Sequence, residues 1–299
     1  PACEVVYCFS SVAREVFQML EGTATLRVLD QGIPPLSYED RLVRDQETVY
    51  SEWCRERPRF NGVEEYSERQ RQEWALTDVI LCPSQFCRRA LLEEGAPENK
   101  IRLLPFGIVP RFLQPFAAQA KRNGLRVLFA GNSPVRKGLP DLVLALEQLR
   151  TRHVHGVFVG ETSSLTSYAL TRTRRVADVL GNVPRPQMVD LYRSADVFVL
   201  PTVSDVFPAV ILEAMAAGLP VITTPNCGSG EIIRDGVEGF IVPVRAPDVI
   251  AEKLTRLLEN PEKRIEMGQA AHERAKEFTI EQYREKLLVL LRQEVMRRF

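Results

Sequence analysis

The chain has 299 residues, of which 45% are hydrophobic and 26% are charged, as in an ordinary soluble globular protein. Basic and acidic residues number 39 each, so net charge gives no reason to expect nucleic acid or a lipid surface as a bulk partner. No signal peptide or uninterrupted apolar span is found, and the six cysteines follow no zinc-site spacing. These features predict a cytoplasmic protein with reduced thiols and no transmembrane segment.

The N-terminal part of the chain starts directly on a strand and then alternates strands with helices. Four short apolar runs predict strands at Glu4–Phe9, Thr25–Leu29, Asp78–Leu81 and Ile101–Leu104. Helices are predicted from Ser10 or Ser11 to Leu20, in two or three pieces between Tyr38 and Leu76, and from Ser84 to Glu94. A turn-rich loop at 30–35 follows the second strand.

A fresh alternation of strands and helices follows a proline-containing segment without apolar periodicity. We therefore expect two domains, 1–108 and 125–279, a linker at 109–124, and a C-terminal helix at 280–299 that crosses back to the first domain. Strands are predicted at Arg126–Ala130, Val154–Val159, Val176–Leu180, Asp196–Leu200, Leu219–Thr223 and Gly239–Pro243. Helices are predicted at Leu139–Leu149, Ser164–Thr173, Pro186–Ser194, Val206–Ala217, Gly228–Asp235, Pro247–Leu258, Pro261–Phe278 and Ile280–Phe299. This alternation indicates doubly wound parallel sheets.

The segment 195–224 carries the clearest functional signal. It is a strand, a loop, a helix and a second strand, and the loop lies at the carboxyl end of the first strand, where ligands bind in open α/β sheets. Pro208 suits the first turn of a helix starting near Phe207, and the free N–H groups of a helix start favour an anion.

The loop and the helix of this segment each carry one acidic residue, Asp205 in the loop and Glu213 on the helix. A carboxylate among apolar neighbours costs several kcal/mol unless it is hydrogen-bonded. A ribose diol would satisfy both oxygens of Glu213. A solvated glutamate, or one paired with an arginine, fits the spacing equally well, so both interpretations stay open.

The loop at 131–138 follows a strand and opens a helix, which directs its amides and Lys137 towards a possible phosphate. It lacks the P-loop spacing, and Arg136 with Lys137 alone would be typical of a solvated basic turn. When the Asp205 and Glu213 segment is considered as well, a phosphate site is favoured over a solvated basic turn. No Asp-x-Asp motif occurs, so no divalent-metal site is predicted. The arginine run at 172–175 is interpreted as a solvated helix end.

Residues 125–280 resemble the donor-binding domain of the retaining, GT-B-fold glycosyltransferases of family 4 (glycosyltransferase group 1). The acidic pair of that family appears as Asp205 and Glu213 inside SDVFPAVILEAMAAGLPVITT, and its phosphate loop appears as GNSPVRKG with Lys137. ADVFVLPT and EIIRDGVEGFIVP also follow the family pattern. Residues 78–107 resemble the end of the family's N-terminal domain more loosely.

The resemblance implies an α/β, GT-B-like fold of two Rossmann-like doubly wound parallel-sheet domains, the N-terminal one incomplete. Lys137 would bind the diphosphate and Asp205 the donor sugar, as the catalytic residues, while Glu213 would bind the ribose hydroxyls. The full donor-binding set would be Gly131, Asn132, Arg136, Lys137, Asn182, Val183, Asp205, Phe207, Pro208, Ala209, Val210 and Glu213. The family usually has arginine at the position of Asn132 and glutamate at that of Asp205.

The implied activity is that of a retaining, metal-independent transferase of the hexosyltransferase type. It would move a sugar from a nucleoside-diphosphate-sugar, its substrate, to an unidentified hydroxyl acceptor without a cofactor. The short N-terminal domain lacks the family's glycine-rich first loop. A non-catalytic nucleotide-sugar-binding or partner-stabilising module is therefore the alternative, and a GT-B sugar-nucleotide epimerase is a third reading. Peripheral membrane contact, and a second copy or partner chain covering the N-terminal sheet, are possible partners.

Overall fold

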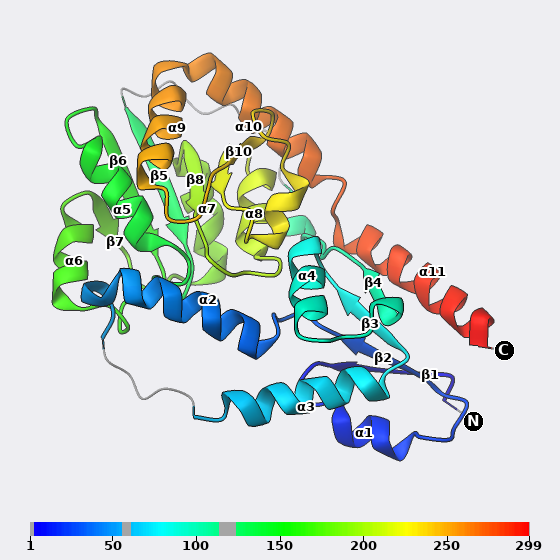
Figure 1. Ribbon diagram of the computed structural model, residues 1–299. Helices are drawn as coiled ribbons and strands as arrows, with labels where there is room; N and C mark the ends of the chain where they lie inside the picture. Colours follow the sequence, from blue (N-terminus) through cyan, green and yellow to red (C-terminus); the bar gives the residue numbers. More distant parts are fainter. Residues whose placement is uncertain (1–2, 56–60, 114–123, 299) are drawn as a thin grey trace.

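The N-terminal lobe is built on a parallel sheet in the order β1–β2–β3–β4. The computed structural model, which describes residues 3–55, 61–113 and 124–298, is shown in Figure 1. The strands are β1 (Val5–Phe9), β2 (Leu26–Asp30), β3 (Val79–Cys82) and β4 (Ile101–Leu103). All four predicted strands are confirmed, with ends that differ by at most one residue, because each is a short apolar run that pairs with its neighbour in the parallel sheet.

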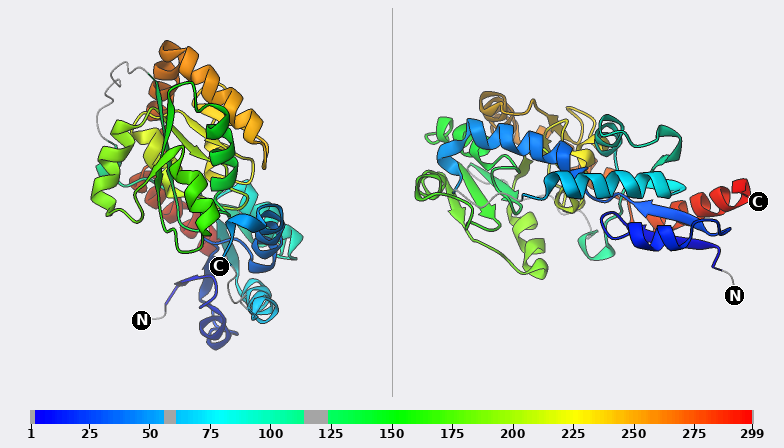
Figure 2. Two further views of the ribbon diagram at one scale, coloured as in Figure 1. Left: turned by 90° about the vertical axis from the view of Figure 1, so that its left-hand side faces the viewer. Right: turned by 60° about the horizontal axis from the view of Figure 1, so that its bottom comes forward.

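Helices cover both faces of this sheet. On one face lie α1 (Arg14–Met19), α3 (Val63–Leu76) and α4 (Gln85–Glu93), which bury Phe17, Trp74 and Phe86 in one cluster. On the other face lies α11 (Ile280–Arg298), whose Leu287 and Leu291 pack against the strands. The last helix of the chain therefore belongs to the first lobe in space, as the views of Figure 2 also show.

The C-terminal lobe contains a parallel sheet in the order β10–β9–β8–β5–β6–β7. Its strands are β5 (Leu125–Ala130), β6 (Val154–Val159), β7 (Ala177–Val179), β8 (Val197–Leu200), β9 (Val221–Thr223) and β10 (Gly239–Ile241). The chain builds outwards from β5 to β7 and then returns to the other side of β5 to add β8, β9 and β10. The order therefore reverses between β5 and β8, which is where open α/β sheets form a ligand crevice.

The helices of this lobe are α5 (Leu139–Gln148), α6 (Ser167–Arg174), α7 (Met188–Ser194), α8 (Ala209–Ala216), α9 (Pro247–Glu259) and α10 (Pro261–Ala275). Helix α8 begins later than predicted, because Pro208 has an extended ψ of 119° and acts as its N-cap instead of lying in the first turn. The helix predicted at Gly228–Asp235 begins where expected but is a short 3₁₀ helix, Gly228–Ile232. It ends early because Ile233 is extended, with a ψ of 123°.

Helix α2 (Leu36–Val49) joins the two lobes, because it leaves the N-terminal sheet and lies along the C-terminal lobe (Figure 1). The Gln46 amide donates to Asp141 over 3.1 Å, and the Tyr50 hydroxyl donates to the other oxygen of Asp141 over 2.6 Å. Trp53 then enters the core of the C-terminal lobe. A second junction forms where Glu231 accepts from the Gln85 and Phe86 amides at the start of α4.

The predicted linker at 109–124 lies largely outside the described residues, so the division into domains at 108, 124 and 279 stays a prediction. Among the residues described, none of the helices combines the length and the apolar character that a membrane crossing requires.

Candidate functional site

The loops that follow β5 and β8 meet at the point where the strand order reverses. The Val203 amide donates to the Arg136 carbonyl oxygen over 3.0 Å, which ties the two loops together. Gly138 precedes α5 with a φ of +80°, and a Cβ there would lie 2.1 Å from the Pro201 carbonyl oxygen. Glycine is therefore required for this approach, and it brings the predicted phosphate loop against the predicted acidic loop.

Lys137 and Asp205 form an ion pair between these loops. Their side chains are 11% and 14% exposed, so both charges are largely removed from water. Burial and, to a lesser extent, the nearby Arg136 guanidinium lower the pKa of Lys137 to about 7. The Asp205 carboxylate acts in the opposite direction by favouring the charged amine. The sequence therefore predicted correctly that these two residues share one place, although their roles there remain a prediction.

The start of α8 lies directly after this pair. Phe207 is buried against Phe106 of the N-terminal lobe, with ring centroids 5.8 Å apart. Pro208 caps the helix, Ala209 is exposed and Val210 is half-buried. The unpaired amides of a helix start carry a partial positive charge, so this position suits an anion.

Glu213, in the second turn of α8, is 4% exposed and has protein partners for both oxygens. The Tyr192 hydroxyl donates to Oε2 over 2.9 Å, and the Arg185 guanidinium binds Oε1. Of the alternatives for Glu213, the structure therefore shows pairing with an arginine. Ribose binding by Glu213 stays a prediction. The Arg185 side chain is 55% exposed and lies over the Phe112 ring, whereas the Glu213 carboxylate is buried, so a ligand that displaces the arginine must bring donors of its own to the carboxylate.

Sequence reasoning missed Tyr192 and Arg185. The signal was available, because a glutamate on a buried helix requires donors, and Arg185 follows the predicted base-flanking loop of Asn182 and Val183. In the structure, Asn182 is exposed and Val183 is half-buried, so this loop brings Arg185 to the carboxylate.

The remaining predicted donor residues make contacts of their own. Gly131 lies against the Lys137 stem, since a Cβ there would be 3.2 Å from the lysine Cγ. Asn132 is exposed and accepts from the Glu161 amide over 3.1 Å. Arg136 donates to Glu39 of α2 over 3.1 Å and to the Ser204 carbonyl oxygen over 2.7 Å. Arg136 therefore points across to the N-terminal lobe in this structure.

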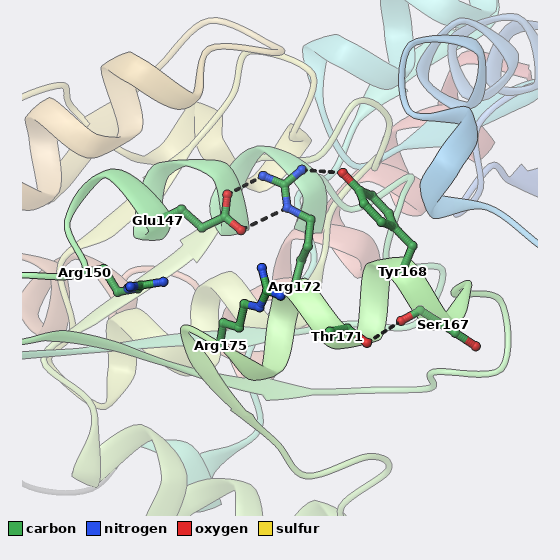
Figure 3. A pocket seen from close by; sticks show the side chains of 7 residues that line it. All are labelled: Glu147, Arg150, Ser167, Tyr168, Thr171, Arg172 and Arg175. Atoms are coloured by element: carbon green, nitrogen blue, oxygen red, sulfur yellow. Dashed lines mark hydrogen bonds and ion pairs between the residues drawn. The ribbon is translucent and has the colours of Figure 1, made fainter.

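A cavity of about 690 Å³ lies elsewhere on this lobe, between α5 and α6 (Figure 3). Arg172 binds Glu147 over 2.9 Å and the Tyr168 hydroxyl over 2.8 Å, so it is paired and not simply solvated as predicted. Arg150 and Arg175 lie just before β6 and β7, at the amino ends of the strands. Because ligands in such sheets bind at the carboxyl ends, we do not place the functional site here.

Residues 111–274, more than half of the chain, match the profile of the family described as glycosyl transferases group 1. The chain belongs to this family. It is 31% identical over 222 residues to a D-inositol 3-phosphate glycosyltransferase of Paenarthrobacter aurescens, which covers 66% of this chain and 54% of that protein. It is 28% identical over 214 residues to the sulfoquinovosyl transferase of Arabidopsis thaliana, covering 67% and 42% of the two chains. The chain thus spans about half the length of these curated relatives.

Solved glycosyltransferase structures share the two-sheet arrangement. Sucrose-phosphate synthase from Thermosynechococcus elongatus superposes with a TM-score of 0.75 at 20% identity, covering 97% of this chain and 73% of that one. Anabaena HepE in complex with UDP and glucose superposes with a TM-score of 0.73 at 16% identity, covering 97% and 78%. The α/β fold of two parallel sheets is therefore that of the GT-B glycosyltransferases, as the sequence predicted.

Proposed function

We propose that this group 1 glycosyltransferase is a retaining, metal-independent hexosyltransferase of family 4. It would move the sugar of a nucleoside-diphosphate-sugar to a hydroxyl acceptor. The observation that carries the proposal is the meeting of Lys137 and Asp205 at the reversal point of the sheet, directly before the start of α8. A lysine, a helix start and a carboxylate at one place match the parts of a sugar-diphosphate: the charged phosphates and the hydroxyls of the sugar.

The donor would bind along the path from this ion pair to Glu213. Lys137 would hold the diphosphate from one side while the amides at the start of α8 hold it from the other. Asp205 would then turn from the lysine to the hydroxyls of the donor sugar. The ribose would reach Glu213, where it would take the place of the half-exposed Arg185 side chain. The HepE structure with UDP-glucose makes a uridine nucleotide the first donor to test.

The chemical role of these residues follows from where charge develops. In a retaining transfer, the bond from the sugar C1 to the diphosphate oxygen breaks, and the acceptor oxygen bonds to C1 on the same face. The acceptor proton passes to the departing diphosphate, which has gained negative charge. Protonated Lys137 and the α8 start would stabilise that charge in a site from which water is largely excluded, so the protein itself supplies the positive charge.

The test is calorimetry with UDP, GDP and ADP and with their common sugar nucleotides, each in the presence of EDTA. We expect one nucleotide to bind, and a ligand at 100 times its dissociation constant to add about 2.7 kcal/mol to the free energy of unfolding. NMR of the product from an acceptor panel then reports the anomer. Inversion at the anomeric carbon, or loss of nucleotide binding in EDTA, would contradict the proposal. Binding without turnover would favour the non-catalytic module, and a changed donor sugar without acceptor would favour the epimerase.

A further inference from the structure

A second cavity, of about 700 Å³, lies at the carboxyl ends of β1 and β2 in the N-terminal lobe. Tyr7 in the middle of β1 and Asp30 at the end of β2 line it, together with residues from the first half of α11. Figure 1 shows the start of α11 beside this sheet, on the side nearest the C-terminal lobe. The cavity therefore lies at the same edge of its sheet, the carboxyl ends of the strands, as the Lys137 loop does in the other lobe, although the order β1–β2–β3–β4 contains no reversal.

Asp30 gives this cavity one unfilled polar position. The residue is 5% exposed, and the Tyr7 hydroxyl donates to its Oδ2. Within the described part of the chain, Oδ1 has no hydrogen-bond donor, although the residue lines the cavity. Burial raises the pKa of Asp30, and the Tyr7 hydrogen bond opposes that shift only in part. A carboxyl group buried with one open oxygen is stabilised by any ligand that brings a donor to it.

Apart from Ser10, whose hydroxyl oxygen accepts from the Gln70 amide over 3.3 Å, the remaining walls are apolar, aromatic or glycine. No lysine, arginine or histidine is among the described residues that line the cavity, which include Phe9, Ile33, Phe106, Ile280, Tyr283 and Leu287. A phosphate or carboxylate placed there would lose its hydration without gaining a cation, and it would be repelled by an ionised Asp30. The walls therefore favour an uncharged ligand whose body packs against rings and aliphatic side chains.

The cavity adjoins the candidate donor loop. Phe106 lines it, and the Phe106 ring meets Phe207 with centroids 5.8 Å apart and Tyr283 with centroids 6.1 Å apart. Phe207 lies two residues after Asp205 in the loop that contacts Lys137. One aromatic ring thus separates the cavity from the loop that would hold the donor sugar.

We infer that this cavity binds the acceptor, and that the acceptor is an uncharged compound with an apolar or aromatic body and a hydroxyl group that donates to Oδ1 of Asp30. The inference rests on the proposed function and adds the chemical class of the second substrate. It also separates this chain from its relatives named for D-inositol 3-phosphate, because a phosphorylated acceptor would require a cation that the described walls of the cavity lack.

The experiment is calorimetry with phenyl glucoside, octyl glucoside and inositol phosphate, run separately from the nucleotide titration. We expect the two apolar glucosides to bind to the parent protein. Asp30→Asn should weaken their affinity at least about tenfold, because the amide keeps one acceptor oxygen but places an N–H group where the other oxygen was. Nucleotide affinity should stay within about twofold in this variant, because Asp30 does not contact the donor loop. Tighter binding of inositol phosphate, or unchanged glucoside binding in Asp30→Asn, would overturn the inference.

A second pair of variants guards against a folding defect in Asp30→Asn. Ile33→Glu adds a charge to an exposed part of the wall, where the side chain is 42% exposed, and should abolish glucoside binding. Met19→Glu adds the same charge on α1, where the side chain is 83% exposed and outside the cavity, and should leave it unchanged. Equal binding by both variants would overturn the inference. If the unmodified protein bound no nucleotide, that result would contradict the proposed function instead. The glucoside titrations would still show whether the cavity binds a neutral ligand.

Discussion

The carboxyl ends of the strands carry opposite chemistry in the two lobes. In the C-terminal lobe, a buried lysine and a helix start lie beside Asp205. In the N-terminal lobe, the same edge presents Asp30 among aromatic and aliphatic side chains, with no cation among the described residues of its cavity. The two edges are therefore suited to different partners, the first to an anion with hydroxyl groups and the second to a neutral molecule.

One type of sheet can therefore present two chemically different edges. In both lobes the parallel sheet directs the loops after its strands to one edge, although the strand order reverses in the C-terminal sheet and not among the described strands of the N-terminal one. What differs is the charge that each loop brings there, and charge decides which ligand recovers the free energy lost on leaving water. The experiments below test the donor edge and the junction between the lobes, beginning with the largest expected effect.

Lys137→Met should remove most of the affinity for a nucleoside-diphosphate-sugar. Methionine keeps the length of the stem that packs on Gly131 but leaves the diphosphate without its cation, which typically costs about 2–5 kcal/mol for a buried charged pair. Calorimetry measures the affinity, and a thermal melt of the variant checks the fold. If the folded variant bound the sugar nucleotide as tightly as the parent, Lys137 would not be the cation that distinguishes the C-terminal edge from the N-terminal one.

Glu213→Ala should weaken donor binding by about 2–4 kcal/mol if two charge-assisted hydrogen bonds to the ribose are lost. Arg185→Ala is the matched control, because it removes the half-exposed partner and keeps the carboxylate. We expect that control to bind the donor at least as well as the parent. A loss in Arg185→Ala as large as in Glu213→Ala would assign the glutamate a purely structural role.

Donor affinity should fall as pH rises above about 7, by about tenfold per unit, because bound diphosphate requires protonated Lys137 and burial lowers the pKa of the free lysine to about 7. The free protein should behave in the opposite way. Between about 7 and the ordinary pKa of 10.5, the unfolded chain binds the additional proton, so this group makes the free energy of unfolding rise with pH. Titrations of a sugar nucleotide from pH 6 to pH 9 measure the first effect. A donor affinity that does not change with pH, or the same pH dependence in Lys137→Met, would contradict this prediction.

Tyr50→Phe should lower the free energy of unfolding by about 1–2 kcal/mol and leave nucleotide affinity unchanged. The variant removes a donor from Asp141, which is fully buried and whose pKa is raised by burial. Urea unfolding measures the loss. Tyr168→Phe, with a side chain 43% exposed and a hydroxyl that meets Arg172, is the control and should change stability by less than about 0.5 kcal/mol. Equal values for the two variants would show that α2 does not stabilise the junction through this bond.

The strands and the meeting of the Lys137 and Asp205 loops could be predicted from the chain because their signals are local. Short apolar runs located the four strands of the first sheet, and the spacing around Lys137 and Asp205 located the two loops that the structure brings together. The helix at Gly228 was predicted to be longer than it is, and its Gly228 amide donates to the Asp205 carbonyl oxygen of another loop over 2.8 Å. Local periodicity contains no information on that contact.

The sequence by itself determined the parallel sheets and the group of residues at the strand reversal, because hydrophobic period and glycine position act over a few residues. Only the tertiary structure decided the partners of Glu213, the crossing of α2 to the second lobe and the enclosure of Asp30 by α11. These depend on residues far apart in the chain, and burial by such residues is what sets the charge and the hydrogen-bonding needs of each side chain.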